Sequence, residues 1–290
     1  DPTLFFSFPT FAALAAHLGA STPIPVNVGE HELPATGRRN AVSSVSCHFP
    51  GMSTVRQVQA GLRCQRNFSS SIPIERWYTD GNDRASYGSF IKGAMQFDQR
   101  SFGLTVMEAG QMDPSQRLLL EHGYAVVTGS DISASSPVGV FVGMMGTVTA
   151  DRSSSRVVSD ASGFAATGAM LSVAAGRLSY LLGLTGPCLT TDTACSSALV
   201  ALHMSSIALK QEESKTAVAA AVGVLLDSWI FTAYATAGML SPRGRCHTFD
   251  ARADGYCRGG PAWEAPHNGA GDLWDCSPTG GMDGVNADGA

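Results

Sequence analysis

Long apolar runs are absent from this 290-residue chain. The longest runs, such as residues 217–226, fall far short of the roughly 20 residues that a membrane-spanning helix needs, so we expect no membrane span. Charged residues are also few, at 15%, and the net charge of −5 gives no sign of a basic surface of the kind that binds nucleic acid. We therefore exclude integral membrane proteins and expect no nucleic-acid partner.

The sequence also lacks paired cysteines. Its seven cysteines are an odd number, and none of them forms a Cys-x-x-Cys motif, which is typical of a reduced, intracellular protein. A late group of possible metal ligands fits none of the compact zinc spacings, so we expect no metal. This group consists of Cys246, His247, Cys257, His267 and Cys276. No secretion signal is visible in the first residues, and we expect a cytoplasmic protein.

What the chain does contain is typical of a globular α/β protein. It is 44% hydrophobic and has 32 glycines, and its length allows a substantial core. Residues 137–143 form a continuous apolar run bounded by Pro and Gly, which predicts a strand buried on both faces. Helical periods at 169–182 and 196–210 alternate with β-type runs just before Cys195 and at 217–225. This alternation predicts a largely parallel sheet covered by helices.

Cys195 lies where a predicted strand gives way to a predicted helix. The strand is broken by Gly186 and Pro187, and small residues surround the cysteine, so its sulfur can stand clear of the backbone. The positive end of a helix dipole lowers the pKa of a nearby thiol and favours the thiolate. The pattern therefore indicates a nucleophile, although a single cysteine taken without its context is more often a buried, inert residue.

The stretch around this cysteine, Thr191-Asp-Thr-Ala-Cys195-Ser-Ser-Ala-Leu-Val-Ala-Leu-His203, strongly resembles the active-site segment of β-ketoacyl synthases. It is most similar to the ketosynthase domains of type I polyketide synthases. Further segments match the same family, namely Ser46-Cys-His-Phe-Pro-Gly51, Pro73-Ile-Glu-Arg-Trp77 and Met112-Asp-Pro-Ser-Gln-Arg-Leu-Leu-Leu-Glu121. The resemblance implies an α/β, thiolase-like fold with a parallel-rich mixed sheet covered by helices, of which this chain holds the first half.

The resemblance also implies a function. In this family the cysteine takes an acyl chain from the phosphopantetheine thioester of an acyl-carrier protein, and this role falls on Cys195. Decarboxylative Claisen condensation with a malonyl unit follows. The expected partners are a carrier protein and a second copy of the chain, and no cofactor is expected to bind directly. The condensation draws on two histidines from His-Gly-Thr-Gly-Thr and Gly-His motifs, and neither motif occurs in this sequence.

Four regions follow from these matches. Residues 1–19 resemble the last helix of an acyl-carrier domain, residues 20–40 are expected to be a linker, and residues 41–259 match the ketosynthase N-terminal region. Residues 260–290 match nothing in the family. They are rich in Gly, Asp, Asn and Pro without a period of 2 or 3.6, so we expect disorder there. A true end, a retained intron and a frameshift all remain open for this tail.

Several side chains have simpler expected roles. We expect His203 to be a packing residue, because it lies about 12 Å along the helix from Cys195. His267 faintly echoes a family histidine, but no strand is expected to present it. We expect Asp113 to cap a helix and Arg117 to be a surface residue, and we place Arg177 off the apolar stripe of its helix.

Two alternatives to an active ketosynthase remain, a condensation-incompetent remnant that binds carrier protein or dimerises, and an unrelated cysteine transacylase or hydrolase.

Overall fold

The computed structural model describes residues 40–78, 86–130, 132, 137–146 and 163–260, together with the backbone of residues 262–268. All of these belong to the second of the chain's two units, which covers residues 38–290. The expected carrier-type helix at residues 1–19 and nearly all of the expected linker at residues 20–40 lie outside the described residues.

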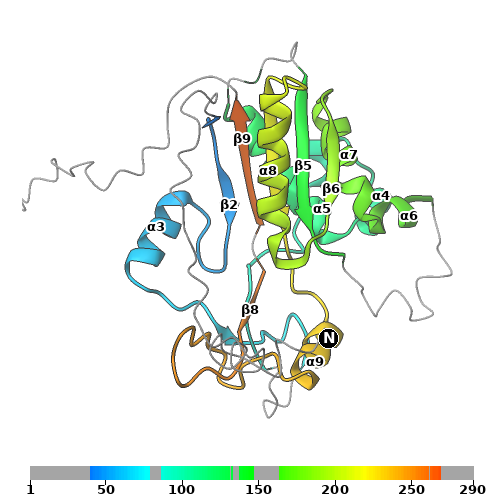
Figure 1. Ribbon diagram of the computed structural model, residues 1–290. Helices are drawn as coiled ribbons and strands as arrows, with labels where there is room; N and C mark the ends of the chain where they lie inside the picture. The colour runs from blue at the N-terminus through cyan, green and yellow to red at the C-terminus, as the bar shows by residue number, and fades with distance from the viewer. Residues whose placement is uncertain are drawn as a thin grey trace, which may run out of the picture. The chain divides into compact units, whose positions relative to one another are not determined.

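The larger of two sheets is mixed, as predicted (Figure 1). Its strands follow the order β1-β9-β7-β5-β6, and β2 also pairs with β9. Strands β5, β6 and β7 are parallel, whereas β9 runs antiparallel to β7, β1 and β2. The strands are β1 Ala41–Val42, β2 Ser46–His48, β5 Val138–Met144, β6 Cys188–Thr191, β7 Thr216–Val222 and β9 Ala262–Asn268.

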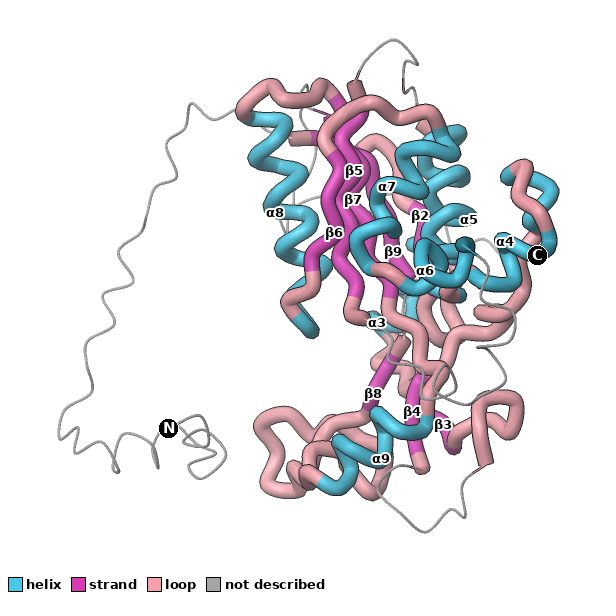
Figure 2. The backbone as a smooth tube through the Cα atoms, turned by 90° about the vertical axis from the view of Figure 1, so that its right-hand side faces the viewer, coloured by secondary structure: helices cyan, strands magenta, loops and turns pink. Residues whose placement is uncertain are grey.

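Helices cover both faces of this sheet. Figure 1 shows α8 in front of the sheet, and Figure 2, turned by 90°, shows α5 and α7 on the opposite side. The helices of this layered part are α4 Val106–Gln111, α5 Pro114–Thr128, α6 Gly163–Ala169, α7 Leu171–Leu182 and α8 Ser197–Lys210, with α3 Val55–Arg63 and the short 3-10 helix Gln99–Phe102 before them. None of the described helices is both long and apolar enough to cross a bilayer.

Strand β5 shows how the sheet is buried. Every one of its residues is buried, as its uninterrupted apolar sequence predicts. Successive side chains of a strand point to opposite faces. Val140 and Val142 accordingly pack in the core on the α5 and α7 side, while Phe141 packs with Ala201 and Ala208 of α8.

A second, smaller sheet lies close to α9, Ser228–Thr236. It has the order β3-β4-β8, with β3 Ser70–Ser71, β4 Tyr87–Ser89 and β8 Arg258–Gly259. Phe231 of α9 is fully buried here. The centroid of its ring lies 5.0 Å from the ring centroid of Trp77 and 6.3 Å from that of Phe90. The guanidinium of Arg258 lies over Phe231 at 5.5 Å and over Tyr234 at 4.6 Å, which is cation–π geometry.

Strand β9 contradicts the expectation of disorder for the segment that follows residue 259. Residues Ala262–Asn268 pair along the whole of β7, with Ala219 opposite Ala265 and Val218 opposite Pro266. Backbone hydrogen bonds to a buried neighbour form this strand despite its lack of an alternating apolar pattern. Pro266, which has no N–H to donate, lies between the β9 residues that pair with β1 and those that pair with β2.

Local structure between residues 113 and 182 partly corrects the sequence predictions. Asp113 caps α5 as expected by accepting the N–H of Ser115 at 2.7 Å, but it is buried, at 3% exposure. Arg117 is partly buried and donates to the carbonyl of Met112 at 2.8 Å, so it is not a surface residue. The helix expected over 169–182 is α7, which begins at Leu171, and a separate helix, α6, ends at Ala169 just before it.

Candidate active site

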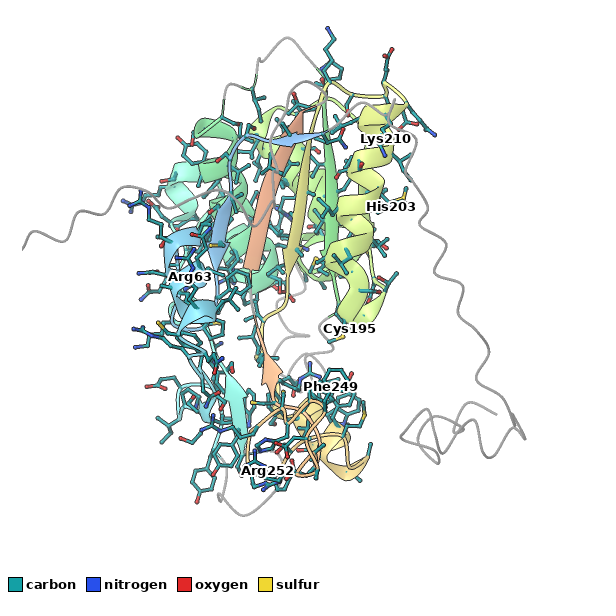
Figure 3. All side chains as sticks on the ribbon, turned by 60° about the vertical axis from the view of Figure 1, so that its left-hand side comes forward. Arg63, Cys195, His203, Lys210, Phe249 and Arg252 are labelled. Atoms are coloured by element: carbon teal, nitrogen blue, oxygen red, sulfur yellow. The ribbon has the colours of Figure 1, made fainter. Side chains whose placement is uncertain are left out.

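Cys195 lies at the junction that the sequence predicts. Strand β6 ends at Thr191, a short 3-10 helix covers Ala194–Ser196, and α8 begins at Ser197. The cysteine therefore lies at the amino-terminal end of α8 (Figure 3). Its side chain is exposed, which a nucleophile that reacts with a bulky substrate requires.

The backbone just before the cysteine is strained. Ala194 has φ 56, in the left-handed region that residues with a side chain rarely adopt. Asp192 stabilises this turn, because one of its carboxylate oxygens accepts the Ala194 N–H at 3.0 Å and the other accepts the Gly146 N–H at 3.3 Å. The carboxylate thus ties the turn to the segment that follows β5.

Ser197 fixes the turn from the helix side. Its buried hydroxyl accepts the Thr193 N–H at 2.8 Å and donates to the Ala194 carbonyl at 2.8 Å. Asp192 and Ser197 therefore hold the backbone of Thr193 and Ala194, the two residues before Cys195. A strained residue that its surroundings hold in place is a common feature of functional sites.

Gly143 allows α8 to begin where it does. A Cβ atom at this position of β5 would lie 2.4 Å from the carbonyl oxygen of Ser197 and 2.8 Å from the nitrogen of Ala198. These distances are too short for any side chain, so the strand and the first turn of the helix are in backbone contact. Sequence reasoning missed Gly143, Asp192 and Ser197, although the latter two lie inside the motif around Cys195.

The expected assignment of His203 to packing is wrong. His203 is exposed on the outer side of α8, and Figure 3 shows it well along the helix from Cys195. Within the part of the chain that the structure describes, no hydrogen bond joins a histidine to Cys195, and no group of three or more His, Cys, Asp or Glu side chains could hold a metal ion. His267 lies in β9, opposite Ala217 of β7 and Val42 of β1.

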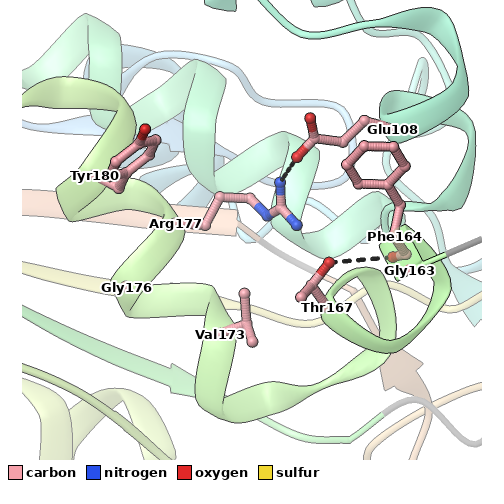
Figure 4. A pocket seen from close by; sticks show the side chains of 8 residues that line it. All are labelled: Glu108, Gly163, Phe164, Thr167, Val173, Gly176, Arg177 and Tyr180. Atoms are coloured by element: carbon pink, nitrogen blue, oxygen red, sulfur yellow. Dashed lines mark hydrogen bonds and ion pairs between the residues drawn. The ribbon is translucent and has the colours of Figure 1, made fainter.

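A separate cavity of about 460 Å³ lies among α4, α6 and α7 (Figure 4). Its lining includes an ion pair between Arg177 and Glu108 at 2.5 Å, and Arg177 also donates to Gln116 at 3.0 Å. The side chain of Arg177 is only 8% exposed. This side chain is therefore buried, although Arg177 lies off the apolar stripe of α7. Cys195 is not among the residues that line this cavity.

Comparison with known proteins identifies the class to which this fold and this cysteine turn belong. The family model described as "Beta-ketoacyl synthase, N-terminal domain" matches residues 38–262. The chain therefore belongs to the β-ketoacyl synthase family. The match extends past residue 259, so it includes the start of β9.

The similar proteins are polyketide synthases. The chain is 35% identical to a phenolphthiocerol/phthiocerol polyketide synthase of Mycobacterium tuberculosis, over 89% of this chain and 15% of that protein. It is 36% identical to the spectinabilin polyketide synthase system protein NorC of Streptomyces orinoci, over 88% of this chain and 12% of that protein. The chain thus spans a small fraction of the relatives that it matches.

Solved structures support the thiolase-like, parallel-rich α/β fold. The ketosynthase of module 6 of the bacillaene synthase from Bacillus subtilis matches with a TM-score of 0.70 and 28% identity, over 79% of this chain and 40% of that one. An oxazolomycin ketosynthase domain from Streptomyces albus matches with a TM-score of 0.70 and 25% identity, over 79% of this chain and 42% of that one. The predictions of family and fold are confirmed.

Proposed function

We propose that Cys195 is the nucleophile that takes an acyl chain from the phosphopantetheine thioester of an acyl-carrier protein in the cytoplasm. The observation that carries the proposal is the exposed sulfur at the turn between β6 and α8, within the segment that matches the family. This turn presents the sulfur at the amino-terminal end of α8.

The transfer exchanges one thioester for another. The Cys195 thiolate attacks the carbonyl carbon of the acyl thioester, and the oxygen gains negative charge in the tetrahedral intermediate. In this proposal the backbone N–H of Cys195 donates a hydrogen bond to this oxygen. The bond from carbon to the phosphopantetheine sulfur then breaks, the leaving thiolate takes a proton from water, and the acyl chain stays on Cys195.

Condensation with a malonyl unit is the second step of the proposed reaction. Its enolate needs donors such as the two family histidines, whose motifs the 290-residue sequence does not contain. Losing even one such donor typically costs about 10²–10³ in rate. We therefore expect this chain by itself to accept an acyl group but to form no carbon–carbon bond.

Acyl loading is tested with an acyl-pantetheine thioester and intact-mass spectrometry. We expect one acyl group per chain, complete loss of loading in Cys195→Ala, and unchanged loading in Cys188→Ala, which removes another exposed cysteine only seven residues away. Malonyl-pantetheine should give no CO₂ release. Loading that survives in Cys195→Ala would refute the assignment, and CO₂ release that Cys195→Ala abolishes would refute the expected loss of condensation.

We also propose that two copies of the chain associate through β6. Among the described strands of the larger sheet, β6 lies at one edge and pairs only with β5, so its outer backbone groups can pair with a second copy. Light scattering should give twice the mass of one chain. Replacing Cys188 of β6, whose N–H faces away from β5, with proline should favour the monomer, whereas a dimer that persists in this variant would place the contact elsewhere.

A further inference from the structure

Two cysteines meet in the segment between α9 and β8. Cys246 and Cys257 are 11 residues apart in sequence, yet the Cys246 sulfur accepts the backbone N–H of Cys257 at 3.2 Å. The same sulfur lies 3.9 Å from the Cys257 carbonyl oxygen. Since an N–Cα bond is about 1.46 Å long, the sulfur lies within about 4.7 Å of the Cys257 Cα atom, so the two cysteines are direct neighbours in space.

The segment itself holds the two cysteines close together. Ser241 donates its N–H to the carbonyl of Tyr256 at 3.0 Å, and Tyr256 donates its N–H to the carbonyl of Met239 at 3.0 Å. The Asp254 carboxylate accepts hydrogen bonds from the Ser241 hydroxyl at 2.7 Å and from Arg243 Nε at 2.8 Å. The ends of this segment are therefore closed before any covalent link forms, so closing the ring between the cysteines costs little additional chain entropy.

The two thiols differ in access. Cys246 is exposed, while Cys257 is partly buried. Burial, and then the proximity of Cys246, raise the pKa of the Cys257 thiol, although a contact with Ser89 and the charge of Arg245 oppose this. The exposed sulfur is thus the one that a dissolved reagent meets first, and the backbone N–H of Cys257 points at it. Cys257 is placed to react second.

Among the described residues, this is the only pair of cysteines that a hydrogen bond connects. Cys64, Cys188 and Cys195 are exposed and Cys47 is buried, so they serve as internal references for a thiol reagent. The pair belongs to the segment that contains Phe249, whose backbone has φ 62 and whose side chain is fully exposed. A covalent link from 246 to 257 would enclose this strained residue in a small ring.

We propose that Cys246 and Cys257 form a thiol–disulfide site that low-molecular-weight disulfides such as oxidised glutathione convert to an intramolecular disulfide. The Cys246 thiolate attacks one sulfur of oxidised glutathione and releases one glutathione thiolate, which leaves a mixed disulfide on Cys246. The Cys257 thiolate then attacks the Cys246 sulfur and releases the second glutathione. Two protein thiols lose two protons and two electrons in total, and one oxidised glutathione becomes two reduced ones.

Trypsin gives a direct measurement of this link. Cleavage after Arg245, Arg252 and Arg258 places the two cysteines on separate peptides, residues 246–252 and 253–258. The full chain is equilibrated with oxidised glutathione at a fixed concentration of reduced glutathione, quenched in acid, blocked with N-ethylmaleimide and digested without reductant. The linked peptide pair should be half-formed at an oxidised glutathione concentration about tenfold below the one that half-modifies Cys64, because the second thiol has a high effective concentration.

Variants and a gel separate the outcomes. Cys257→Ser should accumulate glutathione on Cys246 without linked peptides, and Cys64→Ser should leave the link unchanged. On a non-reducing gel the linked species should migrate as one chain. The proposal is wrong if Cys246 of the unmodified chain retains glutathione, if both thiols remain reduced when Cys64 has reacted, or if the link joins two chains. These outcomes do not depend on whether Cys195 accepts an acyl group.

Discussion

Replacing Gly143 with valine should displace the first turn of α8 and lower the free energy of unfolding by about 3 kcal/mol. The Cβ atom of any side chain at this position would lie 2.4 Å from the Ser197 carbonyl oxygen, and the contact is with backbone that no rotamer change can move. The turn that carries Cys195 must therefore shift away from β5. Acyl loading on Cys195 should fall together with stability.

Urea unfolding and the acyl-pantetheine assay measure the two effects. Gly176→Ala is the matched control, because a Cβ at this position of α7 would have no atom within 4 Å outside its own helix backbone. Alanine there should raise stability by about 0.5–1 kcal/mol, since glycine is the poorer helix former. Unfolding of the Gly143→Val protein at the same urea concentration as the parent would contradict the backbone contact.

The second large effect is acid sensitivity that arises at His122. Burial, and then the nearby His48, lower the pKa of His122 to about 4. The Nδ1 atom of His122 lies 2.7 Å from the Ser46 hydroxyl oxygen. The centroid of its ring lies 6.0 Å from the ring centroid of His48. An unfolded chain binds this proton near pH 6.5, but the folded chain binds it only near pH 4. The contribution of neutral His122 to the free energy of unfolding is thus fully present above about pH 6.5 and is lost as the pH falls toward 4.

The loss due to His122 should reach about 2 kcal/mol at pH 5 and about 3 kcal/mol below pH 4, from the linkage between proton binding and folding. Burial also lowers the pKa of His48, which adds a loss in the same direction. His122→Asn keeps an amide near the position of Nδ1 but cannot titrate. The urea midpoint of the parent should fall more steeply between pH 7.5 and pH 5 than that of His122→Asn, and parallel curves would rule out this role of His122.

The sequence predicts the parts of the fold that have a strong local pattern. The apolar run of β5, the helical period of α8 and the small residues before Cys195 each identify their element, and the structure places all three as expected. The proposed role of Cys195 rests on the family motif, and the acyl-loading experiment tests it. These features depend on residues that are neighbours in the sequence, so the sequence alone is enough to predict them.

Other features depend on contacts between distant residues. Strand β9 has no apolar alternation and contains Pro266, and it forms because β7 offers it a complete set of backbone partners. The role of Gly143 arises from a helix that begins 54 residues later in the chain. The exposure of His203 could not be predicted either, because α8 is apolar around most of its circumference and its sequence does not show which side meets the sheet.

The contact between Gly143 and Ser197 has a consequence for protein engineering. Since main-chain atoms of β5 and α8 touch directly, the height of Cys195 above the sheet is set by backbone geometry and not by the sizes of surrounding side chains. Side chains near the turn, such as the exposed Leu199, can then be enlarged or trimmed while the sulfur stays where it is. The sizes of these side chains and the placement of the Cys195 sulfur are therefore separable design variables in this protein.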